Sequence, residues 1–311
     1  MNSNKNEKSK LILLVGFPRS GTTWFSNLLN AHSEVCYRHE LIGRNYSLFG
    51  ERLFRDMKQN NGLSDADYDK AMEVIYSANI DSDKPPFFKK KYGLHRFPKI
   101  HYFCWLGAKV IPFLRPVYNW LFKLKTKSDW RVLLKETRSL KNMSSMATGL
   151  RIDDLLFLVR RPHGSILSHV NGVKKGTMQP VGQVLKEEIY AELPGSEYLQ
   201  ELYATKNEAS ELTDIECYAA NWTLYHEEVL KLKQQFPQST VCFYDEFVDD
   251  AHGKTQALMK RMNLAYDQAI DSFISASSGQ EQSLLKDAGD EYYSVYRKQS
   301  FDKDAWKKKL A

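Results

Sequence analysis

The chain has 311 residues, with 44 Lys or Arg and 38 Asp or Glu, so its formal net charge is +6. This length accommodates one large α/β domain more readily than two, and the mild positive excess suits an anionic ligand without indicating a nucleic acid partner. The four cysteines are far apart and form no CxxC pair, which argues against a zinc site and against a disulfide-stabilised scaffold.

The N-terminal segment 1–10 is polar, and only five apolar residues follow it, at 11–15. Such a segment is too short for a membrane span and unlike a secretory signal. We therefore expect a flexible tail, followed by a single domain over residues 11–311. A cytoplasmic enzyme is the favoured interpretation, and a catalytic domain trimmed from an anchored protein is the alternative.

The most informative segment is 16–24, with the sequence GFPRSGTTW. The apolar run Leu11–Val15 predicts a buried strand before it, and the apolar spacing after it predicts a helix. A strand, a glycine turn and a helix N-terminus together gather backbone N–H groups around an anion. A nucleoside-triphosphatase loop carries Lys after its second glycine, whereas here Thr22 follows Gly21 and the cation is Arg19, inside the loop. This pattern favours a terminal anion other than a magnesium-bound γ-phosphate.

This loop resembles that of the sulfotransferases that use 3′-phosphoadenosine-5′-phosphosulfate (PAPS), whose pattern is P-[RK]-S-G-T-T, often followed by Trp. The resemblance implies a PAPS-dependent enzyme that releases the bisphosphate PAP and requires no metal. It implies a catalytic role for Arg19 and a place beside the adenine for Trp24. The donor-binding residues that it implies in the loop are Pro18, Arg19, Ser20, Gly21, Thr22, Thr23 and Trp24.

A second strand is expected around Glu34–Glu40, entering the same cleft. The surrounding sequence NAHSEVCYRHE resembles DAHPEVRCGEE of tyrosylprotein-type sulfotransferases, which place a catalytic glutamate 21 residues after the loop cation. The resemblance makes Glu40 the candidate base for the acceptor hydroxyl. One alternative is a surface carboxylate paired with Arg38 or Arg44. Another is His39 as the base, although we expect His39 to point away, because neighbouring strand residues face opposite sides.

Residues 46–150 are predicted to be helix-rich and to form an insertion on the acceptor side of the domain. Within them, residues 87–125 mix Lys and Arg with Phe, Tyr and Trp, and prolines at 98, 112 and 116 exclude one continuous helix. Three interpretations stay open for this segment. It is a cationic helical cap whose rings face the core, a surface that recognises an acceptor such as an anionic glycan, or a peripheral contact with a membrane interface.

Residues 130–137 predict a strand that carries Lys135 near its end, 25 residues before Arg160. Related sulfotransferases have K-T-H or K-x-P at nearly this separation, and their lysine contacts the leaving or transferring oxygens. The resemblance therefore makes Lys135 a second catalytic cation, with a surface charge as the alternative. Thr137 stands where cytosolic relatives have a histidine base, which favours Glu40 as the base. Whether Glu136 shares that role stays open.

The apolar run Leu155–Val159 predicts another buried strand, and Arg160 follows it. The sulfotransferase 3′-phosphate motif has an Arg at a strand end and a Ser eight residues later on the next helix, and Arg160 and Ser168 have this spacing. The resemblance makes them 3′-phosphate ligands, since a guanidinium and a hydroxyl can share that anion. Arg161 and His163 depart from the Asp and Arg that are usual at their positions.

A helical hairpin around 182–236 and a strand at Thr240–Tyr244 complete the predicted elements. Strands interleaved with helices indicate an α/β fold with a P-loop-like, parallel, doubly wound sheet that binds ligands at the carboxyl ends of its strands. Near the C-terminus, Arg297 and Lys298 resemble an Arg-Lys pair that reaches the 3′-phosphate in cytosolic sulfotransferases.

These features predict the transfer of a sulfuryl group from PAPS to a hydroxyl acceptor. A glycan or glycolipid is the favoured acceptor, and a phenol or a peptide tyrosine is the alternative. Two other classes stay open: a P-loop nucleotide kinase, and a non-catalytic protein that binds polyanions or membranes. The sequence carries no signal for a particular oligomeric state.

Overall fold

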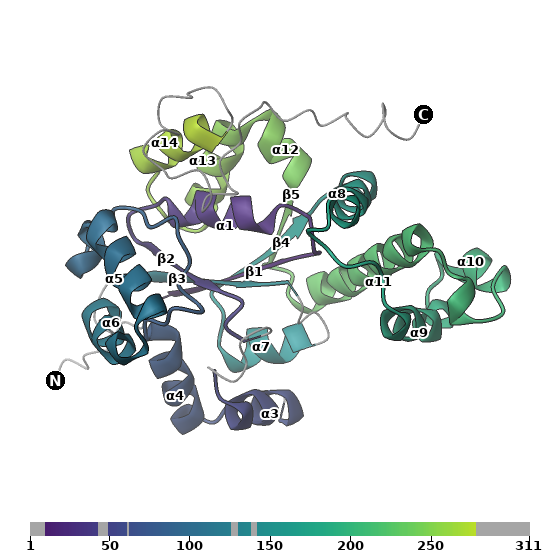
Figure 1. Cartoon of the computed structure of the whole chain (residues 1–311), viewed down its shortest axis with the longest axis horizontal. Coiled ribbons are helices and arrows are strands. Elements are labelled where there is room, and N and C mark those ends of the chain that lie inside the picture. The colour runs from purple at the N-terminus through teal and green to yellow at the C-terminus, as the bar shows by residue number, and fades with distance from the viewer. Residues whose placement is uncertain (1–9, 43–48, 61, 126–129, 138–141, 278–311) are drawn as a thin grey trace.

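The computed structural model describes residues 10–42, 49–60, 62–125, 130–137 and 142–277. At its centre is a sheet of parallel strands in the order β2-β3-β1-β4-β5 (Figure 1). The strands are β1 (Lys10–Gly16), β2 (Val35–His39), β3 (Arg131–Glu136), β4 (Asp154–Val159) and β5 (Thr240–Phe243). The predicted α/β fold with a parallel sheet is therefore confirmed. β1 begins at Lys10, the last residue assigned to the tail, and residues 1–9 lie outside the described part of the chain.

The inner strands are apolar on both faces because helices cover both faces of the sheet. In β1, every residue from Leu11 to Gly16 is buried, and in β4 the run Leu155–Leu158 is buried as well. Strands of parallel sheets carry continuous apolar runs for this reason, whereas a half-exposed antiparallel strand alternates. This physical constraint is what made β1 and β4 recognisable in the sequence.

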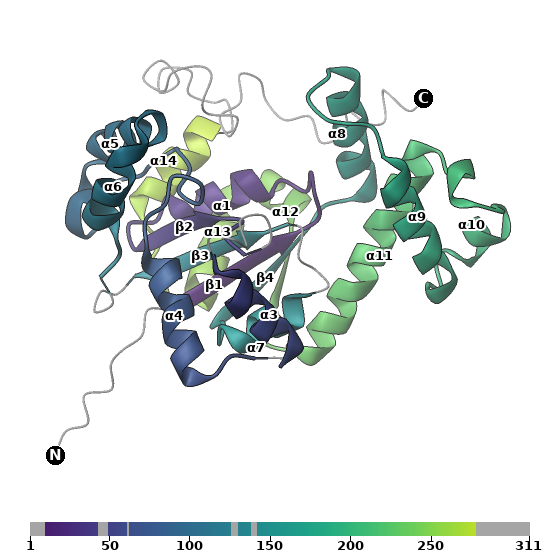
Figure 2. The same ribbon diagram turned by 60° about the horizontal axis from the view of Figure 1, so that its bottom comes forward.

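Two layers of helices enclose the sheet, and each has its own apolar core (Figure 2). The layer that contains the helix after the glycine loop consists of α1 (Thr22–Asn30), α12 (Tyr244–Asp249), α13 (Ala251–Arg261) and α14 (Gln268–Ser277). The opposite layer consists of α3 (Glu51–Gln59), α4 (Asp65–Tyr76), α7 (Met143–Gly149) and α11 (Asp214–Gln235).

A third group of helices lies beside the β2 edge of the sheet: η1 (Gly93–Arg96), α5 (Pro98–Val110), η2 (Pro112–Leu114) and α6 (Arg115–Phe122) (Figure 1). Each of the last three has proline in its first turn, where the missing N–H costs no hydrogen bond, so the prolines divide this segment as predicted. Trp105, Tyr118 and Phe122 form a small core between these helices. Other rings of the segment are exposed, so the interpretation that its rings face the core holds for only part of them.

On the opposite side of the molecule, α8 (Pro162–Lys174), α9 (Gln183–Glu192) and α10 (Gln200–Ala204) gather around the end of α11 (Figures 1 and 2). The turns η4 (Leu193–Gly195) and η5 (Ala209–Glu211) join them. α11 starts at a capping box in which Thr213 and Glu216 satisfy each other's backbone N–H groups. Within the described ranges, no helix has the combination of length and apolar character that crossing a bilayer requires.

Candidate active site

The loop between β1 and α1 depends on glycine at two positions. Gly21, from which α1 starts, has a left-handed φ of 91°, and a β-carbon there would lie 2.3 Å from the ring of Tyr244. At Gly16, the end of β1, a β-carbon would lie 2.4 Å from Thr22 Cγ2. Both distances are shorter than side chains tolerate, so any larger residue would displace the loop. Arg19, between them, also has a positive φ of 71°, which turns its side chain away from the strand direction.

The start of α1 is suited to bind an anion. Gly21 has no side chain that caps the helix, and the first turn carries no acidic residue. The first N–H groups of a helix lack acceptors within the helix and stand at the positive end of its dipole. A phosphate or sulfate next to this turn would satisfy them.

Arg19, Ser168 and Arg160 lie together, although the loop and α8 are far apart in sequence. The Arg19 guanidinium donates to Ser168 Oγ through Nε at 3.1 Å and through Nη2 at 2.9 Å. Arg160 Nη1 donates to the backbone oxygen of Arg19 at 3.0 Å. The residues predicted for the two ends of the donor are thus joined in one hydrogen-bonded group. Their ligand roles stay predictions.

Arg160 is held in place by its surroundings. Its guanidinium carbon lies 4.9 Å from the centre of the Tyr244 ring, and Gly164 on α8 leaves so little room that a β-carbon would lie 2.8 Å from Arg160 Nε. The indole of Trp222 donates to the Arg160 backbone oxygen at 3.2 Å. Tyr244 thus contacts both the loop glycine, Gly21, and Arg160. These contacts depend on where the end of β5 lies relative to the loop, which the spacing of residues in the sequence does not show.

Two buried hydroxyl groups beside this cluster lack a hydrogen-bond partner among the described residues. They are Ser20 Oγ in the loop and Ser165 Oγ in α8, and both residues are fully buried. A buried hydroxyl without a partner is costly unless a ligand or water satisfies it. This donor set, with the N-terminus of α1, fits a nucleotide that carries anionic groups at two positions. In the loop, Thr22 is buried and Thr23 is exposed.

Trp24 is half-buried and packs against the C-terminal helices of the described chain. Its Nε1 donates to Ser277 Oγ at 2.9 Å, and its ring meets Tyr244 edge-on at a centroid distance of 5.9 Å. These contacts fix the indole beside α14. A place for Trp24 beside the adenine stays a prediction, and Pro18, half-buried in the turn, likewise keeps its predicted role.

A second cluster forms where β2 and β3 end. Lys135 Nζ lies 3.3 Å from Glu40 Oε1, and the hydroxyl of Thr137 donates to the same oxygen at 2.6 Å. Glu40 and Lys135 are both nearly inaccessible to solvent, with exposed fractions of 6% and 3%. Burial raises the pKa of Glu40, but Lys135, the Thr137 hydrogen bond and His39 together lower it by more, so its pKa is below the usual value. Glu40 is therefore held as an anion at neutral pH.

The end of β2 explains how Glu40 reaches Lys135. The Glu40 N–H donates to the Lys135 backbone oxygen at 2.9 Å, which continues the hydrogen-bond ladder between β2 and β3. The left-handed φ of Glu40, 44°, then turns the chain out of the strand. Glu136, the next residue of β3, has the opposite orientation. Its carboxylate accepts from the Ile42 N–H at 2.8 Å and is fully buried. This contact ties the turn after β2 to the end of β3.

His39 lies at the last position of β2 with its ring against Tyr37. The Tyr37 hydroxyl and His39 Nδ1 are 2.7 Å apart, and residues two apart on a strand share a face. The alternation of strand faces does not decide how His39 lies relative to Glu40, because β2 ends at His39 and Glu40 is already in the turn.

The two clusters lie at the same edge of the sheet, because they follow the carboxyl ends of the parallel strands β1, β2, β3 and β4. One supplies guanidinium groups and a helix N-terminus, and the other a buried carboxylate and an ammonium. The sequence motifs point to the residues of both clusters. Thr137 is the exception, because the motifs mark it only as the residue that replaces a histidine. Arg297 and Lys298 lie outside the described residues. Among the residues that are described, no group of His, Cys, Asp and Glu is arranged to hold a metal ion.

Comparison with known proteins gives one family and several structures of the same kind. Among curated proteins, none matches the chain. A sulfotransferase domain from the curacin biosynthetic pathway is 14% identical, covers 96% of this chain and 86% of its own, and has a TM-score of 0.44. A sulfotransferase domain from the olefin synthase of Synechococcus PCC 7002 is 13% identical, with coverages of 98% and 90% and a TM-score of 0.42. A sulfotransferase from Alicyclobacillus acidocaldarius is 12% identical, with coverages of 86% and 90% and a TM-score of 0.42.

The family comparison covers both clusters of the site. The model described as "Sulfotransferase family" matches residues 12–182, more than half of the chain, and this range contains the glycine loop, Glu40, Lys135, Arg160 and Ser168. The chain belongs to the sulfotransferase family.

Proposed function

We propose that this sulfotransferase transfers a sulfuryl group from PAPS to a hydroxyl acceptor at the carboxyl edge of its sheet. The observation that carries the proposal is the glycine loop at the start of α1, whose Arg19 is hydrogen-bonded to Ser168 and Arg160. A donor with a 5′-phosphosulfate and a 3′-phosphate needs cations for two anionic groups, and this cluster supplies them. The resemblance of the loop sequence to that of PAPS-dependent enzymes supports the same donor.

In this proposal the N-terminus of α1 and residues 18–24 hold the 5′ end of the donor, and Arg160 and Ser168 hold its 3′-phosphate. Ser20 supplies a buried hydroxyl that has no partner among the described residues. Arg297 and Lys298 are proposed as further ligands of the 3′-phosphate on the resemblance of their sequence alone. PAPS supplies the sulfuryl group, and the protein supplies the fixed charges around it.

The reaction forms a bond between the acceptor oxygen and sulfur and breaks the bond between sulfur and the 5′-phosphate oxygen. Glu40 takes the proton of the acceptor hydroxyl, and the electron pair of the broken bond stays with the phosphate of PAP. Negative charge grows on the sulfuryl oxygens and on the leaving phosphate, and Arg19 and Lys135 are the cations proposed to stabilise it. A carboxylate of lowered pKa is a weak base, so its action depends on close contact with the hydroxyl and on exclusion of water, which the burial of Glu40 supports.

For the acceptor, we propose a glycan or glycolipid. The support is the segment 84–125 beside the β2 edge, which contains ten Lys or Arg, no Asp or Glu, and many aromatic rings. Aromatic rings and basic groups together suit an acceptor that carries both apolar faces and anionic groups. A phenol or a peptide tyrosine is the alternative, because a buried glutamate base serves any of these hydroxyls.

A transfer assay with radiolabelled PAPS and a panel of glycans, glycolipids and phenols tests the proposal. Arg19→Ala and Glu40→Gln are each expected to lower the rate by a factor on the order of 10² or more, since each removes a charge from the reacting centre. Arg52→Ala, which alters an exposed ion pair on α3, serves as the matched control and should retain full activity. Transfer by both site variants at the parental rate would show that these residues are not the catalytic groups.

A further inference from the structure

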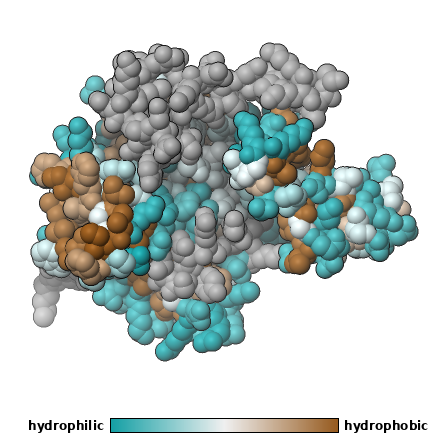
Figure 3. All heavy atoms as spheres, viewed as in Figure 1, coloured by the Kyte–Doolittle hydropathy of each residue, from teal (hydrophilic) through white to brown (hydrophobic). Residues whose placement is uncertain are grey.

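The helices α5 and α6 expose an unusual number of large apolar side chains. In Figure 3 they form the extended hydrophobic area on the side of the molecule where Figure 1 places α5 and α6. Three aromatic rings are the most exposed of this kind in the segment: Phe103 at 67%, Phe113 at 77% and Trp120 at 79%. We call the whole set the α5–α6 face, and it consists of Phe97, Ile100, Phe103, Val110, Ile111, Phe113, Val117 and Trp120.

The spacing of these residues shows that the exposure follows the helices. Ile100, Phe103 and Val110 lie three and seven residues apart, so they share one face of α5, while Trp105 and Ala108 on its other face are buried. On α6, Val117 and Trp120 point outward and Tyr118 and Phe122 inward. Each helix therefore has one apolar face in the small core and a second one directed to solvent. Monomeric proteins seldom leave such a contiguous area exposed without a partner.

All Lys, Arg, Asp and Glu positions of the surrounding segment are occupied by basic residues. Residues 84–125 contain ten Lys or Arg and no Asp or Glu. Lys99, Lys109 and Arg115 are exposed and alternate along the chain with the rings of the α5–α6 face. An anionic surface is therefore the complement of this region. A second copy of the chain is disfavoured, because pairing two such faces would bring like charges together.

We propose that the α5–α6 face docks on an anionic lipid bilayer, with its rings at the level of the headgroups and its basic residues on the lipid phosphates. Exposed Phe, Trp and Val side chains interleaved with Lys and Arg are the features of proteins that lie in a membrane interface. An anionic polysaccharide would pair with the charges and stack on the rings, but it would leave the aliphatic side chains of Ile100, Val110 and Val117 in water. This inference goes beyond sulfuryl transfer and does not depend on it.

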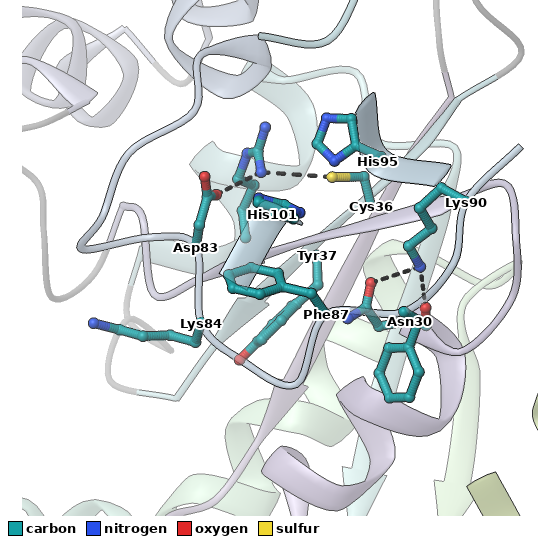
Figure 4. Close-up of a pocket in the computed structure, with 11 residues that line it drawn as sticks. Asn30, Cys36, Tyr37, Asp83, Lys84, Phe87, Lys90, His95 and His101 are labelled. Atoms are coloured by element: carbon teal, nitrogen blue, oxygen red, sulfur yellow. Dashed lines mark hydrogen bonds and ion pairs between the residues drawn. The ribbon is translucent and has the colours of Figure 1, made fainter. Parts of the chain in front are cut away.

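A buried polar chain connects α6, which carries part of the α5–α6 face, to the strand β2; its middle member, Asp83, is labelled in Figure 4. Tyr118 of α6 donates to Asp83 Oδ2 at 2.8 Å, and Asp83 Oδ1 accepts from Arg38 Nη1 at 2.5 Å. Arg38 lies in β2, two residues before Glu40, and both members of the ion pair are fully buried. A bilayer bound at the α5–α6 face would therefore stand in a fixed position relative to Glu40, which suits an acceptor carried by a lipid.

Vesicle co-sedimentation with the whole chain tests the proposal. Wild-type protein is expected to bind vesicles of phosphatidylcholine with phosphatidylglycerol and to bind pure phosphatidylcholine far more weakly. Phe113→Ser with Trp120→Ser should weaken binding about tenfold or more for each ring removed. Lys99→Gln with Arg115→Gln should weaken it about 25-fold, at about fivefold for each charge. Tyr198→Ser, which removes an equally exposed ring far from α5 and α6, should bind like wild type.

Binding of PAP is measured on every variant as a check of folding and of the separate donor site. Unchanged PAP binding with lost vesicle binding supports the docking surface, whether or not sulfuryl transfer is found. Equal binding to both vesicle types overturns the proposed anionic surface. Lipid docking is overturned if the wild-type chain binds neither vesicle type. It is also overturned if the wild-type chain forms a dimer and the double variant Phe113→Ser, Trp120→Ser is a monomer.

Discussion

At the scale of single residues, the proposed reaction depends on the contacts that hold Glu40 in place and ionised. Lys135 and Thr137 both contact Glu40 Oε1, and together with His39 they outweigh the burial that would otherwise raise the pKa of Glu40. Lys135 is also the cation proposed to stabilise the transferring group. In the proposed reaction, one ammonium therefore has two tasks: it keeps Glu40 ionised, and it stabilises the sulfuryl group. Glu40 therefore remains ionised to a lower pH than a free glutamate, whose pKa is 4.5.

This arrangement gives a pH prediction for Thr137→Val. The variant loses a hydrogen bond to the charged form of Glu40, so the pKa of Glu40 rises toward its usual value. The acid limb of the kcat/KM profile should move to higher pH, while the plateau at neutral pH changes little. Thr137→Ser keeps the hydroxyl and should leave the limb where it is. An acid limb that does not move in the valine variant would mean that Glu40 is not the group that titrates.

Sequence patterns named most of the residues that the structure brings together at the candidate site, because the loop and the strand ends carry short motifs with fixed spacing. They could not predict contacts that depend on register between distant segments. Thr137 was recognised as a departure from a histidine, but its bond to Glu40 follows from the alignment of β2 with β3. Arg161, a departure from the second motif, forms an ion pair with Asp245 instead, with Nε 3.9 Å from Oδ2.

At the scale of elements, the strands were predictable and the segment 87–125 was not. β1 and β4 are continuous apolar runs, which a covered parallel strand requires. In 87–125 the prolines excluded one continuous helix, but α5 and α6 are apolar on two faces, so the sequence could not decide which rings are buried.

Lys90 is a second case in which the sequence could not show that a side chain is buried. It belongs to the run Lys89-Lys90-Lys91, whose composition is typical of a solvated surface. Only Lys90 is buried, and Figure 4 shows its Nζ directed to Asn30 at the end of α1. Nζ donates to Asn30 Oδ1 at 3.0 Å and to the His32 backbone oxygen at 3.1 Å. Burial lowers the pKa of Lys90 to about 7, from 10.5 for an exposed lysine.

The sign of the resulting pH dependence follows from proton binding. Between pH 7 and 10.5 the unfolded chain binds a proton at Lys90 that the folded chain has released, so the free energy of unfolding should rise with pH in this range. The gain from this residue between pH 7 and pH 9 is about 2 kcal/mol. Chemical denaturation of wild type and Lys90→Met at both pH values measures it. The gain should disappear in Lys90→Met and persist in Lys89→Met, its exposed neighbour; equal gains in all three proteins would contradict this assignment.

At the scale of the whole molecule, the parallel sheet is what brings the site together. Residues from the ends of β1 to β4 meet at one edge, although they are spread from position 19 to position 168. The class of fold, and the edge at which the candidate site residues gather, could be predicted from alternating strands and helices. The strand order could not, because the sequence does not show that β3 lies between β2 and β1.

We propose that a fixed arginine cluster, without magnesium, binds a bisphosphate nucleotide at the start of α1. Calorimetry with PAP in the presence of EDTA, compared with ATP and magnesium, tests it most directly. We expect PAP to bind with one site per chain, and we expect Arg160→Ala to weaken this binding about tenfold or more, as the loss of a charged hydrogen-bond donor predicts. Tight binding of ATP only with magnesium, together with no detectable binding of PAP, would contradict the proposed donor site.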